Sequence, residues 1–283
     1  MSDNGQVFSG KAFHYVKGRP SYPPEVIALL RSECGLTSNS IIADVASGTG
    51  IFTKLLLDNG NPVFAVEPNE DMRMAAEGYL KSYGKLSSVK GTAEATTLGD
   101  HSINFVTVAH AVHWFNIPQA RKEFFRILKN DGWLVIINNS PDIKTPFELA
   151  YANLRKRYSI KRGAHIGQSY SSQETAMKNI YGGSTYMQKH FPHQHRLDWE
   201  GLVARLLSKS SVPNETEPGH DSMLKEVKII FDKYQIDGCV AQEYKTNVTY
   251  GHIAGLGAWA VRLRGVFSQA LLRRPRVRAV RSG

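Results

Sequence analysis

Short apolar runs alternate with amphipathic segments along the first half of the chain. The run Ile41–Val45 leads into a glycine-rich turn, and apolar residues at helical spacing follow over 51–58. A second run, 61–68, ends in polar residues, and Asn69 then supplies a helix N-cap with two acidic residues behind it. The pattern therefore predicts a βαβ unit followed by another helix.

The same alternation continues to about residue 140. Residues 87–98 predict a short strand and a loop, and 103–115 form a nearly continuous apolar run, typical of a strand buried on both faces. A helix is predicted over 119–130, a turn over 130–132 and a fifth strand over 133–140. This order predicts an α/β fold with a Rossmann-like, doubly wound, mostly parallel sheet.

The pattern changes after residue 140. Residues 147–158 predict a helix, but 159–190 show no sustained period and predict a cap or a long insertion. Helical spacing returns over 197–208 and 223–235, and 240–250 predict a closing strand. We therefore expect a seven-stranded sheet with an N-terminal lid and a helical cap. The expected divisions are a lid over 1–35, a cofactor-binding core over 36–145, cap and sheet completion over 146–250, and a basic tail over 251–283.

Composition adds little to this picture. The chain has 283 residues, of which 42% are hydrophobic and 21% charged, as in ordinary globular proteins. Its two cysteines, Cys34 and Cys239, form no CxxC pair, which excludes a disulfide framework or a zinc knuckle. Neither a secretion signal nor an apolar run long enough for a membrane span is apparent, so we expect a cytoplasmic protein without a membrane partner.

The charge is concentrated at the C-terminal end. The formal net charge is +10, and seven arginines with no acidic residue lie in 252–283, so 1–251 carry only the remaining +3. That small excess argues against a nucleic-acid partner for the main body. The tail is either an arm for nucleic acid or an acidic membrane, or an extension without a selected role. We favour the second alternative because the composition changes abruptly.

Polar residues gather where the first two predicted strands end. Asp44–Gly50 follow the first strand, and Glu67 closes the second, 17 positions after Gly50. Ligands of doubly wound sheets bind at the carboxyl ends of the strands. Glycines let a ligand approach the backbone closely, and a carboxylate can accept both hydroxyls of a ribose. The residues therefore predict a nucleoside cofactor.

Two classes of nucleoside cofactor compete for this loop. A nicotinamide dinucleotide carries a pyrophosphate, which favours a third glycine where Thr53 stands. Asp44, just before the glycines, would repel a diphosphate and attract a cation. A cationic cofactor is therefore favoured.

The loop DVASGTG resembles the first motif of the class I S-adenosylmethionine-dependent methyltransferases, and Glu67 stands where that family binds the ribose. Gly91–Glu94 resemble its adenine-side motif, and Ala109–Phe115 resemble its segment after strand four. More closely, FSGKAFHYVKGRPSYP together with HWF resembles the methyltransferase type 11 subgroup related to trans-aconitate methyltransferase. The resemblance covers about 8–250, with specific motifs in 8–140.

The resemblance implies S-adenosyl-L-methionine as the cofactor and assigns residues to it. The implied cofactor-binding residues are Tyr15, Arg19, Asp44, Ala46, Ser47, Gly48, Gly50, Glu67, Pro68, Met72, Ala93, Glu94 and Ala109. Tyr15 and Arg19 would form the lid. The implied acceptor-binding residues are Tyr22, Trp114 and Phe115. Plain packing is the alternative role for Met72, Trp114 and Phe115.

His110 and His113 are the candidate catalytic residues, because they follow the fourth strand. A histidine could take a proton from a hydroxyl or amine acceptor, whereas a carboxylate acceptor needs no base. A structural role is the alternative for both. His190, His193 and His195 have no companion carboxylate or cysteine, so the sequence predicts a solvated loop there and no metal site.

We expect a methyltransferase that acts on a small molecule, with a carboxylic acid as the candidate acceptor. One alternative is methylation of a nucleic acid or a protein, and another is a catalytically silent cofactor-binding regulator. The sequence does not indicate the oligomeric state.

Overall fold

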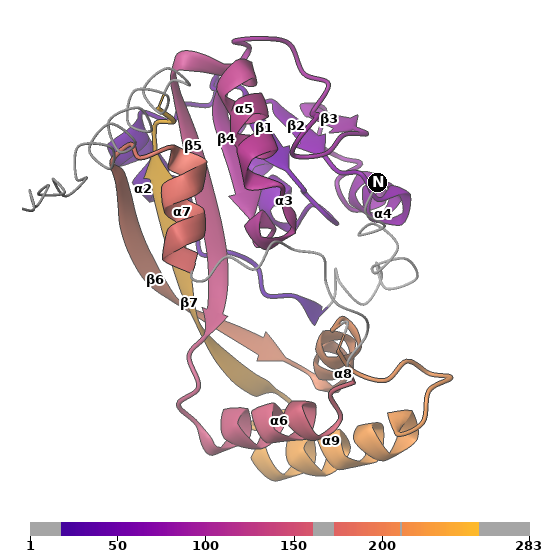
Figure 1. The fold of residues 1–283 in the computed structure, drawn as a ribbon. Helices are drawn as coiled ribbons and strands as arrows, with labels where there is room; N and C mark the ends of the chain where they lie inside the picture. Colours follow the sequence, from indigo (N-terminus) through magenta and orange to yellow (C-terminus); the bar gives the residue numbers. More distant parts are fainter. Residues whose placement is uncertain (1–17, 161–172, 210, 255–283) are drawn as a thin grey trace, which may run out of the picture.

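The computed structural model describes residues 18–160, 173–209 and 211–254, and a seven-stranded sheet forms its centre (Figure 1). The strand order is β3-β2-β1-β4-β5-β7-β6. The strands are β1 Ile42–Val45, β2 Val63–Val66, β3 Leu86–Val89, β4 Ile103–Ala109, β5 Leu128–Pro141, β6 Tyr186–Leu197 and β7 Val240–Gly251. The pairs from β3 through β5 are parallel, whereas β7 is antiparallel to β5 and to β6. The predicted seven-stranded, mostly parallel α/β sheet is confirmed.

Helices cover both faces of the sheet. The helices are α2 Glu25–Cys34, α3 Ile51–Asp58, α4 Glu70–Tyr79, α5 Ile117–Ile127, α6 Pro146–Arg157, α7 Gln173–Tyr181, α8 Trp199–Leu207 and α9 His220–Tyr234. Successive strand residues point to opposite faces, so Ile42 packs with α2 and α3, whereas Ala43 packs with α5 and α7. Both faces are apolar, as in parallel sheets covered on two sides.

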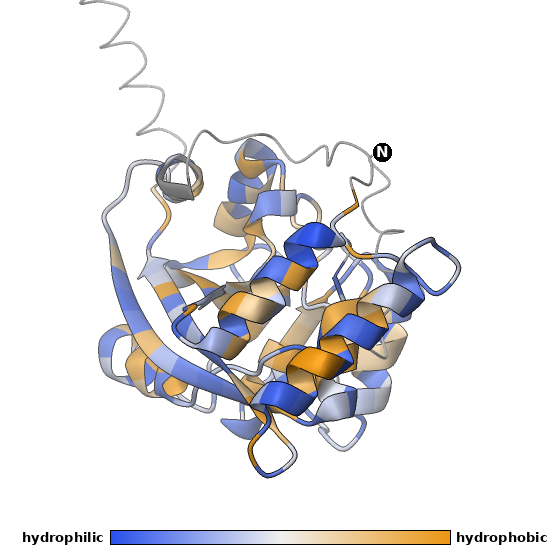
Figure 2. Ribbon diagram, turned by 90° about the horizontal axis from the view of Figure 1, so that it is seen from below, coloured by the Kyte–Doolittle hydropathy of each residue, from blue (hydrophilic) through white to orange (hydrophobic). Residues whose placement is uncertain are grey.

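A third apolar cluster lies beyond the sheet, where α6, α8 and α9 meet the far ends of β6 and β7 (Figure 1). Leu154, Leu202 and Val227 contribute one buried side chain from each helix, and Leu197 and Val240 contribute the strand ends. Viewed from below, the nearest helices carry hydrophilic and hydrophobic stripes on different faces (Figure 2). These helices form the predicted cap.

The prediction for 159–190 is wrong in its described part. Residues 173–181 form α7, which packs against α5 on the sheet and buries Ile180 and Tyr181. The predicted histidine loop is strand β6, which pairs along its whole length with β7. Because β6 is an edge strand with mostly accessible side chains, it has no apolar alternation that sequence reasoning could detect.

Two predicted boundaries also differ from the structure. Strand β4 ends at Ala109, because His110 has a φ of 61° and the next residues form a short 3-10 turn over Val112–Trp114. Strand β5 begins at Leu128, and its register with β4 shifts before Trp133. The predicted turn at 130–132 therefore lies within an irregular stretch of β5.

Some predictions fall on the undescribed part of the chain. Tyr15 and residues 255–283 lie outside the described residues, so the lid role of Tyr15 and the role of the basic tail stay predictions. Helix α2, placed within the expected lid segment, packs on the sheet beside α3. Within the described ranges, no helix has both the length and the apolar character needed to cross a bilayer.

Candidate functional site

The connection between β1 and α3 is a tight loop at the carboxyl end of the sheet. Ala46, Gly48 and Gly50 all have positive φ, at 55°, 57° and 81°. The N–H of Ser47 donates to the carbonyl of Val66 at 3.2 Å, and the N–H of Gly50 donates to the carbonyl of Ser47 at 3.0 Å. The predicted cofactor loop is thus held close to the end of β2.

Glu67 fastens this loop from the neighbouring strand. Its Oε2 accepts the N–H of Gly48 at 2.9 Å, and its Oε1 accepts the N–H of Asn69 at 2.9 Å. Burial raises the pKa of Glu67, although the two backbone donors oppose that shift. A carboxylate oxygen can accept two hydrogen bonds, so each oxygen retains capacity for one hydroxyl. This arrangement fits a ribose at the predicted position.

Asp44 has a different environment from the one expected of a residue that contacts a ligand. It is fully buried, and its two carboxylate oxygens accept the hydroxyls of Thr53 at 2.6 Å and Thr107 at 2.9 Å. Burial raises the pKa of Asp44 to about 6, against the effect of these two hydrogen bonds. The side chain joins α3 to β4 beneath the loop, so its geometry supports a positioning role.

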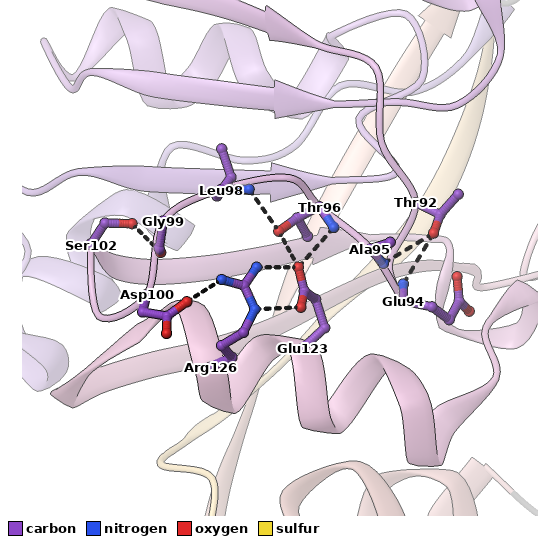
Figure 3. Close-up of polar contacts among 10 residues, drawn as sticks. All are labelled: Thr92, Glu94, Ala95, Thr96, Leu98, Gly99, Asp100, Ser102, Glu123 and Arg126. Carbon is purple, nitrogen blue, oxygen red and sulfur yellow. Dashed lines mark hydrogen bonds and ion pairs between the residues drawn. The ribbon is translucent and has the colours of Figure 1, made fainter.

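A polar network anchors the predicted adenine-side loop to α5 (Figure 3). Glu123 accepts both the N–H and the hydroxyl of Thr96, at 2.8 and 2.6 Å. Arg126 donates to both oxygens of Glu123 and also pairs with Asp100. Burial alone would raise the pKa of Glu123, but hydrogen bonds from Arg126 and Thr96 lower it to about 2. The loop that carries the predicted adenine contacts is therefore attached to a helix.

Of the predicted adenine-binding residues, Ala93 and Glu94 lie in this loop, whereas Pro68 and Met72 follow β2. Met72 and Ala93 are each 4% exposed, whereas Pro68 is exposed. The carboxylate of Glu94 accepts the N–H of Asn116 at 2.8 Å, which ties it to the start of α5. The direct adenine contacts of these residues stay predictions.

The part of the chain that contains the glycine loop, Glu67 and the adenine-side network is similar to a known protein family. Residues 43–136 match the family described as a methyltransferase domain. This segment is similar to methyltransferase domains. The matched segment runs from β1 into β5 and includes Asp44, Glu67 and Glu123.

Similar proteins extend this finding over more of the chain. An uncharacterized methyltransferase of Mycobacterium bovis is 35% identical over 140 residues, which cover 50% of this chain and 55% of that protein. One from Schizosaccharomyces pombe is 28% identical over 144 residues, covering 50% and 56%. The chain thus spans little more than half the length of these curated relatives.

Among solved structures, a proposed type II methyltransferase of Anaeromyxobacter dehalogenans superposes with a TM-score of 0.60 at 15% identity. The match covers 83% of this chain and 98% of that one. At this identity the likeness concerns the fold alone.

A pocket of about 560 Å³ opens beside the glycine loop of the matched segment. The predicted site residues that line it are Arg19, Tyr22, Ala46, Ser47, Gly48, Ala109 and His110. Two hydroxyl oxygens of the glycine loop, Ser47 Oγ and Thr49 Oγ1, are buried without a hydrogen-bond partner among the described residues. Unpaired buried hydroxyls are uncommon, so their presence here fits a polar ligand such as the methionine portion of the cofactor.

His110 is the predicted catalytic residue that the structure brings to the pocket. His110 is exposed to solvent, yet the protein around it removes part of the hydration of its ring. Its pKa therefore falls to about 4. Loss of hydration is the largest cause, followed by the positive charges of Arg19, His113, Lys209 and Arg205. His110 is therefore neutral at pH 7.

Three other predicted residues do not line this pocket, although the ring of His113 lies 6.2 Å from that of His110. His113 is exposed and lies against the half-buried Trp114, with 4.9 Å between ring centroids. Phe115 is buried and packs edge-to-face on Phe124. None of His113, Trp114 and Phe115 is among the described residues that line the pocket. Packing explains Phe115, and the site roles of all three stay predictions.

Sequence reasoning missed three pocket residues that come from distant parts of the chain. Asn139 comes from β5, Arg205 from α8 and Tyr244 from β7. Arg205 is 4% exposed, and its Nη2 donates to the hydroxyl of Tyr244 at 2.9 Å. That hydroxyl donates to Gln242 Oε1 at 2.8 Å, which leaves its lone pairs for Arg205. The one available signal was an arginine within the otherwise apolar helical segment LVARLL.

Proposed function

We propose that this protein is an S-adenosylmethionine-dependent methyltransferase that acts on a small molecule. The observation that carries the proposal is the hydrogen bond from Gly48 to Glu67, which sets a ribose-accepting carboxylate beside a glycine loop. This pair lies within the segment that matches methyltransferase domains. The finer assignment, to the type 11 subgroup related to trans-aconitate methyltransferase, is part of this proposal.

Several residues of the chain would hold the cofactor. S-adenosylmethionine supplies, when bound, an activated methyl group on a positively charged sulfur. Glu67 would accept the ribose hydroxyls, and Gly48 would let the ligand approach the backbone. The partnerless hydroxyls of Ser47 and Thr49 would bond the polar methionine end. Met72 would cover the adenine.

A carboxylic acid is the proposed class of acceptor. Arg19 and Arg205 both line the pocket beside the loop, and their guanidinium groups stay charged throughout the physiological range. A carboxylate enters already ionised, so methylation of its oxygen requires no base. The protein's contribution is then to align the two reactants and to exclude water.

A role for His110 depends on the acceptor. If the acceptor is a carboxylate, His110 serves packing or hydrogen bonding, and the His110→Ala, His113→Ala double variant retains turnover. If the acceptor is a hydroxyl or an amine, neutral His110 can accept its proton, and the double variant loses turnover at every pH. Turnover of the two proteins with each acceptor class distinguishes these roles.

Calorimetric titration with S-adenosylhomocysteine tests the cofactor site first. We expect the wild type to bind and Glu67→Ala to bind more weakly, with Glu70→Ala as the control because Glu70 is an exposed acidic residue on the same segment. Transfer of a labelled methyl group to a panel of small carboxylic acids then tests the acceptor class. Absence of binding by the wild type would refute the proposal.

The remaining alternatives are outcomes of the same experiments. Methyl transfer to RNA or protein that disappears on deletion of 252–283 would favour a macromolecular acceptor. Binding of S-adenosylhomocysteine without transfer to any acceptor would favour a regulatory, catalytically silent protein.

A further inference from the structure

Residues 18–22, here called the strap, form part of the wall of the pocket beside the glycine loop. Arg19, Pro20 and Tyr22 of the strap line this pocket, together with the loop residues from Ala46 to Thr49. Residues 19–22 belong to no helix or strand, so no ladder of backbone hydrogen bonds holds them in place. Their position therefore depends on individual contacts with the rest of the protein.

The first part of the strap lies directly on helix α8. A Cβ built on Gly18 would lie 2.2 Å from the backbone nitrogen of Arg205, so only a glycine allows this close approach. Arg19 Nη2 donates to the carbonyl of Ser208, the residue that follows α8, at 3.3 Å. A positive charge is favourable at a helix C-terminus. Since α8 also supplies Arg205 to the pocket wall, the strap and this helix meet at the pocket.

Asn139 attaches the next part of the strap to the sheet. Its Nδ2 donates to the carbonyl of Ser21 at 3.0 Å, across 118 residues of sequence. Asn139 is buried and itself lines the pocket. The ring of Tyr22, one residue further along, packs edge-to-face on Phe52 of α3, with 5.0 Å between centroids. The bond to Asn139 thus holds the backbone between the two pocket-lining side chains of Arg19 and Tyr22.

Thr246 fixes the orientation of the Asn139 amide. It stands directly opposite Asn139 in the antiparallel pair of β5 and β7, and its hydroxyl donates to Asn139 Oδ1 at 2.6 Å. An asparagine side chain has one acceptor group and one donor group, so this bond leaves the donor group facing Ser21. Thr246 is buried and is not among the described residues that line the pocket. An effect of Thr246 on a bound ligand must therefore pass through Asn139.

We propose that Asn139 is a positioning residue for methyl transfer and that Thr246 sets its orientation. This inference rests on the proposed function. By holding the carbonyl of Ser21, Asn139 keeps Arg19 and Tyr22 at the ligand bound beside the glycine loop. Loss of this bond makes local opening of the strap less costly, so the ligand dissociates faster.

Asn139→Ala and Thr246→Val test the proposal through the dissociation rate of S-adenosylhomocysteine, measured by stopped flow. We expect Asn139→Ala to release the ligand about threefold to tenfold faster than the wild type, and Thr246→Val to change the rate in the same direction. The double variant should release it at the rate of Asn139→Ala, because Thr246 acts through Asn139. Additive effects of the two substitutions would contradict this order of action.

Thr249→Val is the matched control. Thr249 is a second buried threonine of β7, and its hydroxyl accepts a hydrogen bond from Gln188 on β6 at 3.2 Å. Neither Thr249 nor Gln188 is among the described residues that line the pocket. The control should release S-adenosylhomocysteine at the wild-type rate, whatever its thermal midpoint. Equally fast release by Thr249→Val and Thr246→Val would assign the effect to loss of stability and overturn the inference.

Hydrogen exchange of the free protein provides a readout that needs no ligand. Peptides that contain residues 18–22 should exchange faster in Asn139→Ala and Thr246→Val than in the wild type and Thr249→Val. Unchanged exchange in both variants would overturn the inference, whether or not the cofactor binds. If the wild type binds S-adenosylhomocysteine and both variants release it at the wild-type rate, only this inference fails. If the wild type does not bind it, the proposed function fails.

Discussion

The carboxylate of Glu67 accepts the backbone N–H of Gly48 at 2.9 Å across 19 residues of sequence. This contact joins the end of β2 to the loop after β1, where parallel neighbouring strands end side by side. The expected ribose acceptor and the close-approach glycine are therefore parts of one unit. A change at Glu67 acts on both the charge and the shape of the site.

Glu67→Ala should weaken binding of S-adenosylhomocysteine by about tenfold to a hundredfold, because a hydrogen bond to a charged group contributes about 1.5–3 kcal/mol. Isothermal calorimetry measures the affinity, and Glu70→Ala should bind as the wild type does. An unchanged affinity in Glu67→Ala would place the ribose elsewhere.

Gly50→Ala should destabilise the fold by about 2–4 kcal/mol. The φ of Gly50 is 81°, which costs an alanine about 1–2 kcal/mol, and a Cβ there would lie 2.6 Å from Leu80 Cδ1. Gly35 is a matched control, because its φ is 68° and no atom lies within 4 Å of a Cβ built on it. Urea unfolding of both variants separates backbone strain from collision. Equal losses of stability would mean that the contact with Leu80 costs nothing.

Asp44 should make the free energy of unfolding fall as the pH rises from about 4 to about 6. Burial raises its folded-state pKa to about 6, so the folded state binds the proton more tightly than the unfolded state over that interval. The linked change is up to about 3 kcal/mol. Asp44→Asn should lack this component, and above pH 6 the difference between the two proteins should stay constant. Parallel stability curves from pH 4 to pH 7 would contradict the assignment.

Glu123 should have the opposite pH dependence. Its pKa is lowered to about 2, so its stabilising effect is complete above its unfolded pKa and is lost as the pH falls toward 2. Glu123→Gln should lower the free energy of unfolding by about 1–3 kcal/mol at pH 7, and the difference should shrink at pH 3. Asp100→Asn, at the exposed end of the same network, should cost at most about 1 kcal/mol. A loss from Glu123→Gln that is equal at both pH values would exclude the charge as its origin.

The sequence alone determined the N-terminal half of the fold, where several local sequence signals predict the same elements. Apolar runs, the glycine loop and the Asn69 cap act over a few residues, so the βαβ order and the position of Glu67 follow from the sequence. The N–H of Met72 donates to Asn69 Oδ1, which confirms that cap. The same logic failed for β6, because an edge strand with accessible side chains has no period of its own and is defined by its pairing with β7.

The far wall of the pocket beside the glycine loop was decided by tertiary structure. Arg205 and Tyr244 come from α8 and β7, and no spacing in the chain relates them to the glycine loop. The antiparallel return of β7 beside β5 brings Tyr244 close to that loop, and packing of α8 adds Arg205. Asp44 combines both cases. Its type and position follow from the sequence motif, but only the folded structure shows that its carboxylate accepts hydrogen bonds from Thr53 and Thr107 inside the protein. Sequence patterns record interactions within an element, whereas the surroundings of a side chain depend on elements that meet only when the chain is folded.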